Sequence, residues 1–280
     1  MARLDPGGQE AGKLSAEAAF EVARAIELGR GVKPDLFLAL RWYYLAATLG
    51  SPQAQYALAL AYDKGQLVER EPEAALYWHI LAAEGGVLEA QKRLCDIYHG
   101  GEGVSKHEIT AAGWCAMAAE NGSAEAQLFM GDAYYYGRGV ERDLKKSTEF
   151  YGLAAEKGSA EAQLFLGDAY YYGQGVNRNL KKSFEWYSLA AENGNIDAWL
   201  ALGNAYERGE GVAKRLESAV DCYAMAAEAG NPQAQFFLAE ALYNGRGIRR
   251  DRQKAMEWYA RAARGGDREA RRRLSQLGRR

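Results

Sequence analysis

The chain has few prolines and cysteines and contains no long apolar run. The 280 residues include only 5 prolines but 32 glycines, so we expect the glycines to end helices rather than to form linkers. The chain has no run of about eighteen apolar residues, which a membrane-spanning helix would need. Its N-terminal residues also lack the apolar centre of a secretory signal. We therefore expect a cytoplasmic protein that binds no membrane, or a periplasmic or secreted one if a leader has been removed.

The cysteines do not predict a disulfide framework. Cys95, Cys115 and Cys222 are too few and too irregularly spaced for one. A single bridge between Cys95 and Cys115 is conceivable if two helices bring them together, and the sequence leaves this open. The 3 histidines show no metal-ligand spacing, and His79 stands where other units have tyrosine, so we expect it in the core. No metal or cofactor is predicted.

Motifs that would indicate catalysis are also missing. The stretch GGQEAGKLS, residues 7–15, has the glycine and lysine spacing of a phosphate loop, but Leu14 replaces the Ser or Thr that binds magnesium. No β-strand is predicted before it, so a flexible leader is the better interpretation. Carboxylates are abundant on solvated helix faces, which does not make an acid/base pair. We expect a protein that is not an enzyme.

One motif recurs every 36 residues through most of the chain, which indicates a repeat architecture. An alanine marks each start, at Ala18, Ala54, Ala90, Ala126, Ala162, Ala198, Ala234 and Ala270. The predicted organisation is a leader at 1–14, seven units at 15–50, 51–86, 87–122, 123–158, 159–194, 195–230 and 231–266, and a capping half-unit at 267–280.

The first half of each unit predicts an amphipathic helix. In the fourth unit, Ala126, Met130 and Ala133 follow helical spacing, and Ser123 precedes them as an N-cap. Glycines that suit a left-handed helix end close these helices, at Gly29, Gly65, Gly101, Gly137, Gly173, Gly209 and Gly245. A G-x-G-V loop follows and departs from this pattern once, at Leu67.

The second half of each unit predicts another helix, which in the fifth unit carries Ser183, Trp186 and Tyr187 on one face and ends at Gly194. Five units have tryptophan at one position, where we expect it to fill the space between helices: Trp42, Trp78, Trp114, Trp186 and Trp258. Small residues such as Gly167 allow close helix approach. A single unit cannot bury this face alone, so the units must stack into an all-α solenoid.

These motifs resemble a known family. The pattern A-E-A-Q-x-x-L-G-x-x-Y-x-x-G-x-G-V, followed by A-x-x-W-Y-x-x-A-A-E-x-G, is similar to the Sel-one-like repeat (SLR) family, relatives of tetratricopeptide repeats, over residues 15–280. The resemblance implies a right-handed α-α superhelix that serves as a scaffold for protein–protein contacts. Secreted members carry a disulfide in each repeat, a pattern that this chain lacks.

By analogy with tetratricopeptide solenoids, the far face of each first helix would line a concave groove. Tyrosines, phenylalanines and acidic or amide side chains recur there, which predicts binding of a protein or peptide partner that is basic. The candidate residues are Phe129, Asp132, Tyr135, Tyr136, Phe165, Asp168, Tyr171, Tyr172, Asn204, Phe237, Glu240 and Tyr243. This series of aromatic residues is interrupted at Ala201 and Glu207. An alternative interpretation has these rings packing between units, with the near-identical fourth and fifth units reflecting duplication.

The C-terminal end offers a second candidate surface. Residues 246–280 hold 13 Lys/Arg and 4 Asp/Glu, although the whole chain has a net charge of −2. A basic patch for nucleic acid or an anionic partner would contain Arg249, Arg250, Arg252, Arg271, Arg272 and Arg273. No nucleic-acid fold accompanies them, so we favour a polar cap for the solenoid, with the regulatory basic patch as the alternative function. Self-association of this basic end with the acidic body is a third hypothesis.

Overall fold

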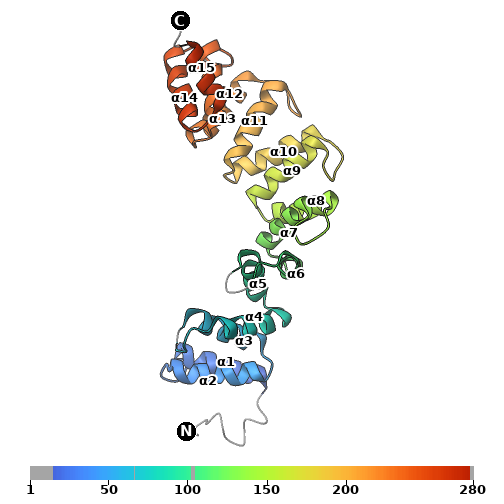
Figure 1. Ribbon diagram of the computed structural model, residues 1–280, viewed down its shortest axis with the longest axis vertical. Coiled ribbons are helices and arrows are strands. Elements are labelled where there is room, and N and C mark those ends of the chain that lie inside the picture. Colours follow the sequence, from blue (N-terminus) through green and yellow to red (C-terminus); the bar gives the residue numbers. More distant parts are fainter. Residues whose placement is uncertain (1–14, 66, 102–104, 278–280) are drawn as a thin grey trace, which may run out of the picture. The chain divides into compact units, whose positions relative to one another are not determined.

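The computed structural model describes residues 15–65, 67–101 and 105–277, and this part of the chain folds entirely into helices joined by short loops (Figure 1). The leader 1–14, with most of the GGQEAGKLS stretch, lies outside the described residues. The helices are α1 Ala16–Leu28, α2 Leu36–Thr48, α3 Pro52–Lys64, α4 Pro72–Glu84, α5 Leu88–Gly100, α6 Glu108–Glu120, α7 Ala124–Tyr136, α8 Leu144–Glu156, α9 Ala160–Tyr172, α10 Leu180–Glu192, α11 Ile196–Arg208, α12 Leu216–Glu228, α13 Pro232–Asn244, α14 Arg252–Arg264 and α15 Arg268–Leu277.

The first helices end where the sequence predicted, whereas α10 ends at Glu192, two residues before the predicted Gly194. The Ser123 side chain accepts a hydrogen bond from the Ala126 amide and begins α7, and Gly137 ends it with a φ of 73°. The predicted end glycines of the other first helices also adopt positive φ. Leu67 stands where the other loops have a second glycine, and among the described residues it is the one non-glycine residue with positive φ.

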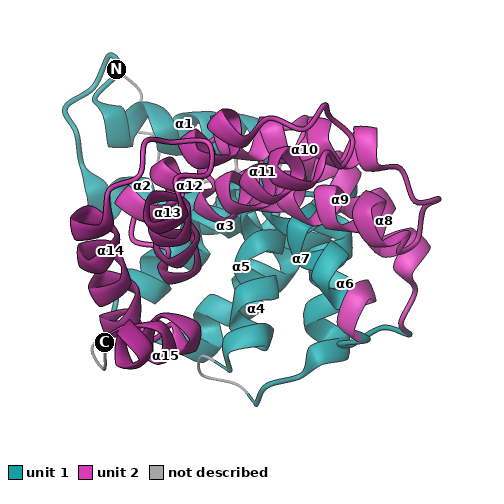
Figure 2. Ribbon diagram, turned by 90° about the horizontal axis from the view of Figure 1, so that it is seen from above, with its two compact units in different colours: residues 1–133, 137–141 teal, residues 134–136, 142–280 magenta. Residues whose placement is uncertain are grey.

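Odd-numbered helices from α1 to α13 are the first helices of the seven repeats, and even-numbered helices are the second. Within each of two compact units the two helices of a repeat pack together, as α9 and α10 do, and a second helix also packs on the next first helix, as α10 does on α11. Unit 1 comprises residues 1–133 and 137–141, and unit 2 comprises residues 134–136 and 142–280 (Figure 2). The described residues therefore form a solenoid of stacked helix pairs.

Alanine lies at most of the closest helix contacts. Ala54 and Ala198 are fully buried because each starts a first helix that faces the preceding repeat. Ala18 has the same position in α1 but is exposed, since no described helix precedes it. Gly167 shows why small residues are needed within a repeat, because a Cβ there would collide with the Tyr187 ring.

The expectation for tryptophan in the second helices is correct for only two of the five. Trp42 and Trp78 are buried, whereas Trp114, Trp186 and Trp258 are partly exposed. The next residue along the helix fills the core instead. Tyr151, Tyr187, Tyr223 and Tyr259 are buried there, as are His79 and Cys115 at the same position. The residue after the tryptophan points toward the partner helix, and the tryptophan itself lies at the edge of the interface.

A disulfide joins α5 to α6, so the structure decides a question that the sequence left open. Cys95 and Cys115 are bonded, with their Cα atoms 5.1 Å apart. The pair forms because residues 20 apart face each other across one helix hairpin. Cys222 is a buried free thiol, and burial raises its pKa to about 11.

Candidate protein-binding groove

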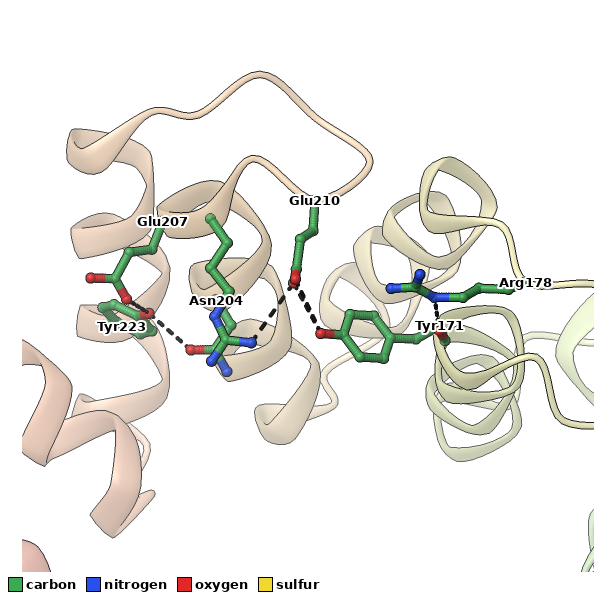
Figure 3. A network of polar contacts seen from close by, with 7 residues as sticks. Tyr171, Arg178, Asn204, Glu207, Glu210 and Tyr223 are labelled. Atoms are coloured by element: carbon green, nitrogen blue, oxygen red, sulfur yellow. Dashed lines mark hydrogen bonds and ion pairs between the residues drawn. The ribbon is translucent and has the colours of Figure 1, made fainter.

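A recurrent hydrogen bond links the two helices within a repeat. The Tyr187 hydroxyl on α10 donates to Asp168 on α9 at 2.7 Å. Tyr223 donates to Asn204 at 2.9 Å and to Glu207 at 3.0 Å (Figure 3). Tyr259 donates to Glu240 in the same way. The acidic and amide positions that the sequence assigned to a partner therefore also bind tyrosines of their own repeats.

Burial changes the acidity of this pair. Desolvation raises the pKa of Asp168, although the hydrogen bond from Tyr187 acts in the opposite direction. Desolvation and the Asp168 charge together raise the pKa of Tyr187 far above its ordinary value. At neutral pH the tyrosine therefore remains a donor to a carboxylate that is partly removed from solvent.

Two pairs of adjacent tyrosines at the ends of α7 and α9 divide between structural and exposed roles. The Tyr171 hydroxyl reaches Glu210 in the loop of the next repeat at 3.1 Å (Figure 3). In the same way, the Tyr135 hydroxyl reaches Gln174 at 3.3 Å. Their neighbours are exposed to solvent, Tyr172 by 65% and Tyr136 by 53%. The second tyrosine of each pair is therefore the more exposed one.

The phenylalanines of the candidate surface pack between repeats. Phe165 stacks on Tyr151 of the preceding repeat with ring centroids 4.8 Å apart, and Phe237 stacks on Tyr223 at 5.2 Å. Phe129 meets His99 edge-on at 5.0 Å. These contacts match the alternative interpretation of the sequence, in which the rings are part of the architecture.

Unit 2 contains a groove of about 840 Å³ that follows α11. One stripe of α11 forms its floor, from Asp197 through Leu200, Ala201 and Asn204 to Arg208. The groove is also lined by Leu164, Asp168, Tyr171 and Tyr172 of α9, Ser183, Phe184 and Tyr187 of α10, Glu210, and residues at 231–233 and 265–267. Four predicted partner-binding residues thus meet at this groove: Asp168, Tyr171, Tyr172 and Asn204.

The other predicted residues lie elsewhere. Tyr135, Tyr136 and Phe165 line a hollow of about 110 Å³. Phe237 and Glu240 line one of about 220 Å³. Phe129 and Asp132 belong to unit 1. Tyr243 contacts Arg252 and Arg273, both in unit 2.

Helix α11 departs from the repeat at three of its positions, and one of them, Ala201, lines the groove. Trp199 replaces a glutamine, Ala201 replaces a phenylalanine of the neighbouring repeats, and Glu207 replaces a tyrosine. Because Ala201 has no ring, the space beside Tyr187 of the preceding repeat stays open to the groove. Phe165 and Phe237 fill the equivalent spaces beside Tyr151 and Tyr223. The interruption of the aromatic series was visible in the sequence, but we had not predicted that it opens a groove.

The arginines of the predicted basic patch do not act as one free surface. Arg273 forms an ion pair with Glu240 at 2.8 Å and lies over the Tyr243 ring, which Arg252 also contacts. Arg271 donates to the Ala263 carbonyl at 3.0 Å. Arg272 pairs with Glu269 within α15. Arg249 and Arg250 are exposed in the loop between α13 and α14. Arg271 and Arg273 therefore hold the capping helix in place.

Two other kinds of site are absent from the described part of the chain. No group of three or more His, Cys, Asp or Glu side chains is arranged to hold a metal ion there. None of the helices in residues 15–65, 67–101 and 105–277 is both long and apolar enough to cross a membrane.

Comparison with known proteins matches the repeat structure. The Sel1 repeat matches seven times, at residues 16–51, 52–87, 88–123, 124–159, 160–195, 197–231 and 232–267. No curated protein sequence matches significantly. A crystal structure of a protective antigen present in uropathogenic Escherichia coli strains, which displays an SLR fold, is 34% identical with a TM-score of 0.77, over 96% of this chain and 58% of that one.

A Sel1 repeat protein from Oxalobacter formigenes is 30% identical with a TM-score of 0.66, over 95% of this chain and 77% of its own. The chain thus spans less than two thirds of the E. coli protein and about three quarters of the O. formigenes protein. Proteins built from Sel1 repeats generally mediate protein–protein interactions. The repeat matches, the solenoid and both structural relatives show that this chain belongs to the Sel1 repeat family.

Proposed function

We propose that the chain is a non-catalytic scaffold that binds a protein or peptide segment in the groove along α11. The observation that carries this proposal is the groove itself, which follows one stripe of a first helix for most of its length. A cleft of this length suits an extended or helical peptide better than a small molecule. The exposed ring of Tyr172 at its margin offers the kind of contact area that is enriched at protein interfaces.

The charges of the lining favour a basic partner. Carboxylates of Asp168, Asp197, Glu210 and Asp267 line the groove. Arg208 is the one basic side chain among the lining residues, and it pairs with Glu210 at 4.0 Å. A surface with this excess of negative charge attracts cationic segments and repels anionic ones.

The alternative function, in which the basic end contacts nucleic acid or an anionic partner, has less support. Arg273 and Arg271 are engaged within the protein. Arg249, Arg250 and Arg252 remain exposed, but they lie in and after a single loop. Self-association through this end stays a prediction, which sedimentation at low and high salt can test.

The test is a selection of randomised peptides displayed on phage against the purified chain. We expect basic peptides to be enriched, and their affinities to fall by roughly tenfold in Tyr172→Ala, a typical loss for an exposed aromatic contact. The matched control is Tyr77→Ala, which removes an exposed tyrosine from α4 in unit 1. Peptides that bind both variants and the wild type equally would contradict the proposal.

A further inference from the structure

One position of the first helix varies along the chain, and its variation predicts what the groove accepts. From the second repeat on, this position faces the tyrosine site of the preceding repeat. It holds phenylalanine at Phe129, Phe165 and Phe237, arginine at Arg93 and Arg273, alanine at Ala57 and Ala201, and glutamate at Glu21 in the first repeat. At Phe165 and Phe237 the planar side chain stacks on the tyrosine of the preceding repeat. At Ala201 that place is open to the groove.

Arg273 shows how a guanidinium fills the same place. Its Nε lies 2.8 Å from the Glu240 carboxylate, and its Cζ lies 5.3 Å from the centre of the Tyr243 ring. Contact with the Tyr259 hydroxyl and with Glu240 raises the pKa of the Arg273 guanidinium. An acid, a tyrosine on the first helix and a tyrosine on the second helix thus form a cradle for one arginine.

The groove contains the same three side chains with alanine in the place of Arg273, although Arg178 lies 5.9 Å from the centre of the Tyr171 ring. Two repeats before Glu240, Tyr243 and Tyr259, the chain has Asp168, Tyr171 and Tyr187, and all three line the groove. Asp168 accepts a hydrogen bond from the Tyr187 hydroxyl, as Glu240 does from the Tyr259 hydroxyl. Ala201 stands where Arg273 stands. The hollow measures about 840 Å³ there, compared with about 110 Å³ one repeat earlier, where Phe165 occupies the position.

The groove also contains a buried polar side chain beside this tyrosine. Ser183 lines the groove and is only 2% exposed. Its hydroxyl interacts with that of Tyr187 and has no other hydrogen-bond partner among the described residues. Five other repeats have alanine at this position, namely Ala39, Ala75, Ala111, Ala219 and Ala255. A polar ligand in the groove would give this hydroxyl a further hydrogen-bond partner.

We propose that the groove binds an arginine side chain of the partner, with its guanidinium between Tyr171 and Tyr187 and paired with Asp168. This inference rests on the proposed function, because it assigns the chemistry of one partner residue in the same groove. A guanidinium combines the planarity that fits the space of the missing phenylalanine with the charge that the carboxylate requires. Asp197, whose charge acts on Asp168, adds to this preference.

Lysine and aromatic side chains fit the cradle less well. A lysine ammonium is compact and strongly hydrated, so it cannot cover the tyrosine face as a planar group does. A phenyl ring would cover that face but would leave Asp168 desolvated further without a counter-charge. The cradle should therefore bind arginine in preference to lysine, which is charged but not planar, and to phenylalanine, which is planar but not charged.

The test uses Nα-acetyl-arginine amide as the probe, with the lysine and citrulline analogues as comparisons. Binding is followed by NMR through the methyl signal of 13C-labelled Ala201 in the full chain. We expect a saturable shift with the arginine probe and roughly tenfold weaker binding of both analogues, since citrulline lacks the charge and lysine the plane. No shift with arginine, or equal affinity for the three probes, would overturn the proposal.

Two variants locate the effect. Asp168→Asn keeps an acceptor for Tyr187, as Asn204 does for Tyr223, and should bind the arginine probe roughly tenfold more weakly. Ala201→Arg should fill the cradle from within and abolish probe binding, whereas Ala57→Arg should not; because Ala201→Arg removes the labelled methyl group, both variants are compared by isothermal titration calorimetry. Ala57 is the matched control because Arg24 replaces the acid in the repeat that precedes it. Retained binding in Asp168→Asn would overturn the proposal even if Ala201→Arg failed to fold.

The outcomes separate this inference from the proposed function. If selected peptides bind the groove and lose affinity in Tyr172→Ala but show no preference for arginine, the peptide scaffold stands and the arginine site is wrong. If the arginine probe binds at Ala201 but no peptide does, the cradle exists and the scaffold proposal fails.

Discussion

The side-chain amide of Gln163 donates a hydrogen bond to the backbone carbonyl of Ala155 at 3.0 Å, from the start of α9 to the end of α8. The same bond recurs in four other repeats, where Gln55, Gln91, Gln127 and Gln235 reach Ala47, Ala83, Ala119 and Ala227. Arg271 replaces the glutamine in the capping helix and reaches Ala263. Each bond adds a second donor to a carbonyl at a helix end, which also accepts the amide of the glycine three residues later.

Gln163→Ala should lower the free energy of unfolding by about 1 kcal/mol, because it removes one of the two donors to the Ala155 carbonyl and leaves the Gly158 amide. It also removes the acceptor of the Asn193 amide. Urea unfolding followed by circular dichroism measures the loss. The control is Gln253→Ala on the exposed face of α14, which should stay within about 0.5 kcal/mol of the wild type. Equal losses in both variants would contradict a capping role.

The Cys95–Cys115 bond should raise stability by about 3 kcal/mol, because it closes a loop of 20 residues in the unfolded chain. Thiol titration in denaturant should therefore find one free thiol, that of Cys222, rather than three. The double variant Cys95→Ser/Cys115→Ser should unfold at a lower temperature, and reductant should lower the melting temperature of the wild type only. Three titratable thiols in the untreated protein would show that the bond does not form.

Two glycines in helix interiors should respond to alanine in opposite directions. Gly152 lies in α8 with nothing within 4 Å of an added Cβ, so Gly152→Ala should stabilise the protein by up to about 1 kcal/mol through helix propensity. Gly167→Ala should destabilise it by about 1–3 kcal/mol, because the methyl group would collide with the Tyr187 ring. Differential scanning calorimetry compares the two, and a stabilised Gly167→Ala would show that the ring can move away.

Asp168→Asn should make stability less dependent on pH. Burial raises the pKa of Asp168 in the folded state, so the folded chain binds its proton more tightly than the unfolded chain does. The carboxylate therefore destabilises the fold above its raised pKa, and this cost disappears as the pH falls below its ordinary value of about 4. The stability advantage of Asp168→Asn should be largest at neutral pH and shrink on acidification, as measured by urea unfolding at several pH values. An advantage that grows on acidification would contradict this sign.

Arg273→Ala should destabilise the capping helix, whereas Arg272→Ala should not. Removal of Arg273 leaves Glu240 without its ion pair at 2.8 Å, and we expect a loss of about 1–2 kcal/mol, discounted because both side chains are partly exposed. Arg272 is exposed and pairs only within α15. Hydrogen exchange of the α15 amides measures the difference. Similar exchange in both variants would favour the free basic patch over the cap.

The sequence predicted the helices well because their signals are local. Ser123 and Gly137 determine the ends of α7 through their own side chain and backbone, and the 36-residue period places equivalent ends in the other repeats. It predicted the core less well, since tryptophan and the following residue differ by only one step around the helix. That step decided that Tyr187 is buried and that Trp186 remains at the edge.

By itself, the sequence determined a repeated helix pair, its start and stop residues, and the need to stack. Only the tertiary structure decided which side chains meet between those helices, because contacts between residues 14 to 39 positions apart depend on helix rotation and packing distance. Those contacts bonded Cys95 to Cys115 and joined Tyr171 to Glu210. They also placed Ala201 beside Tyr187, where a missing ring becomes a groove.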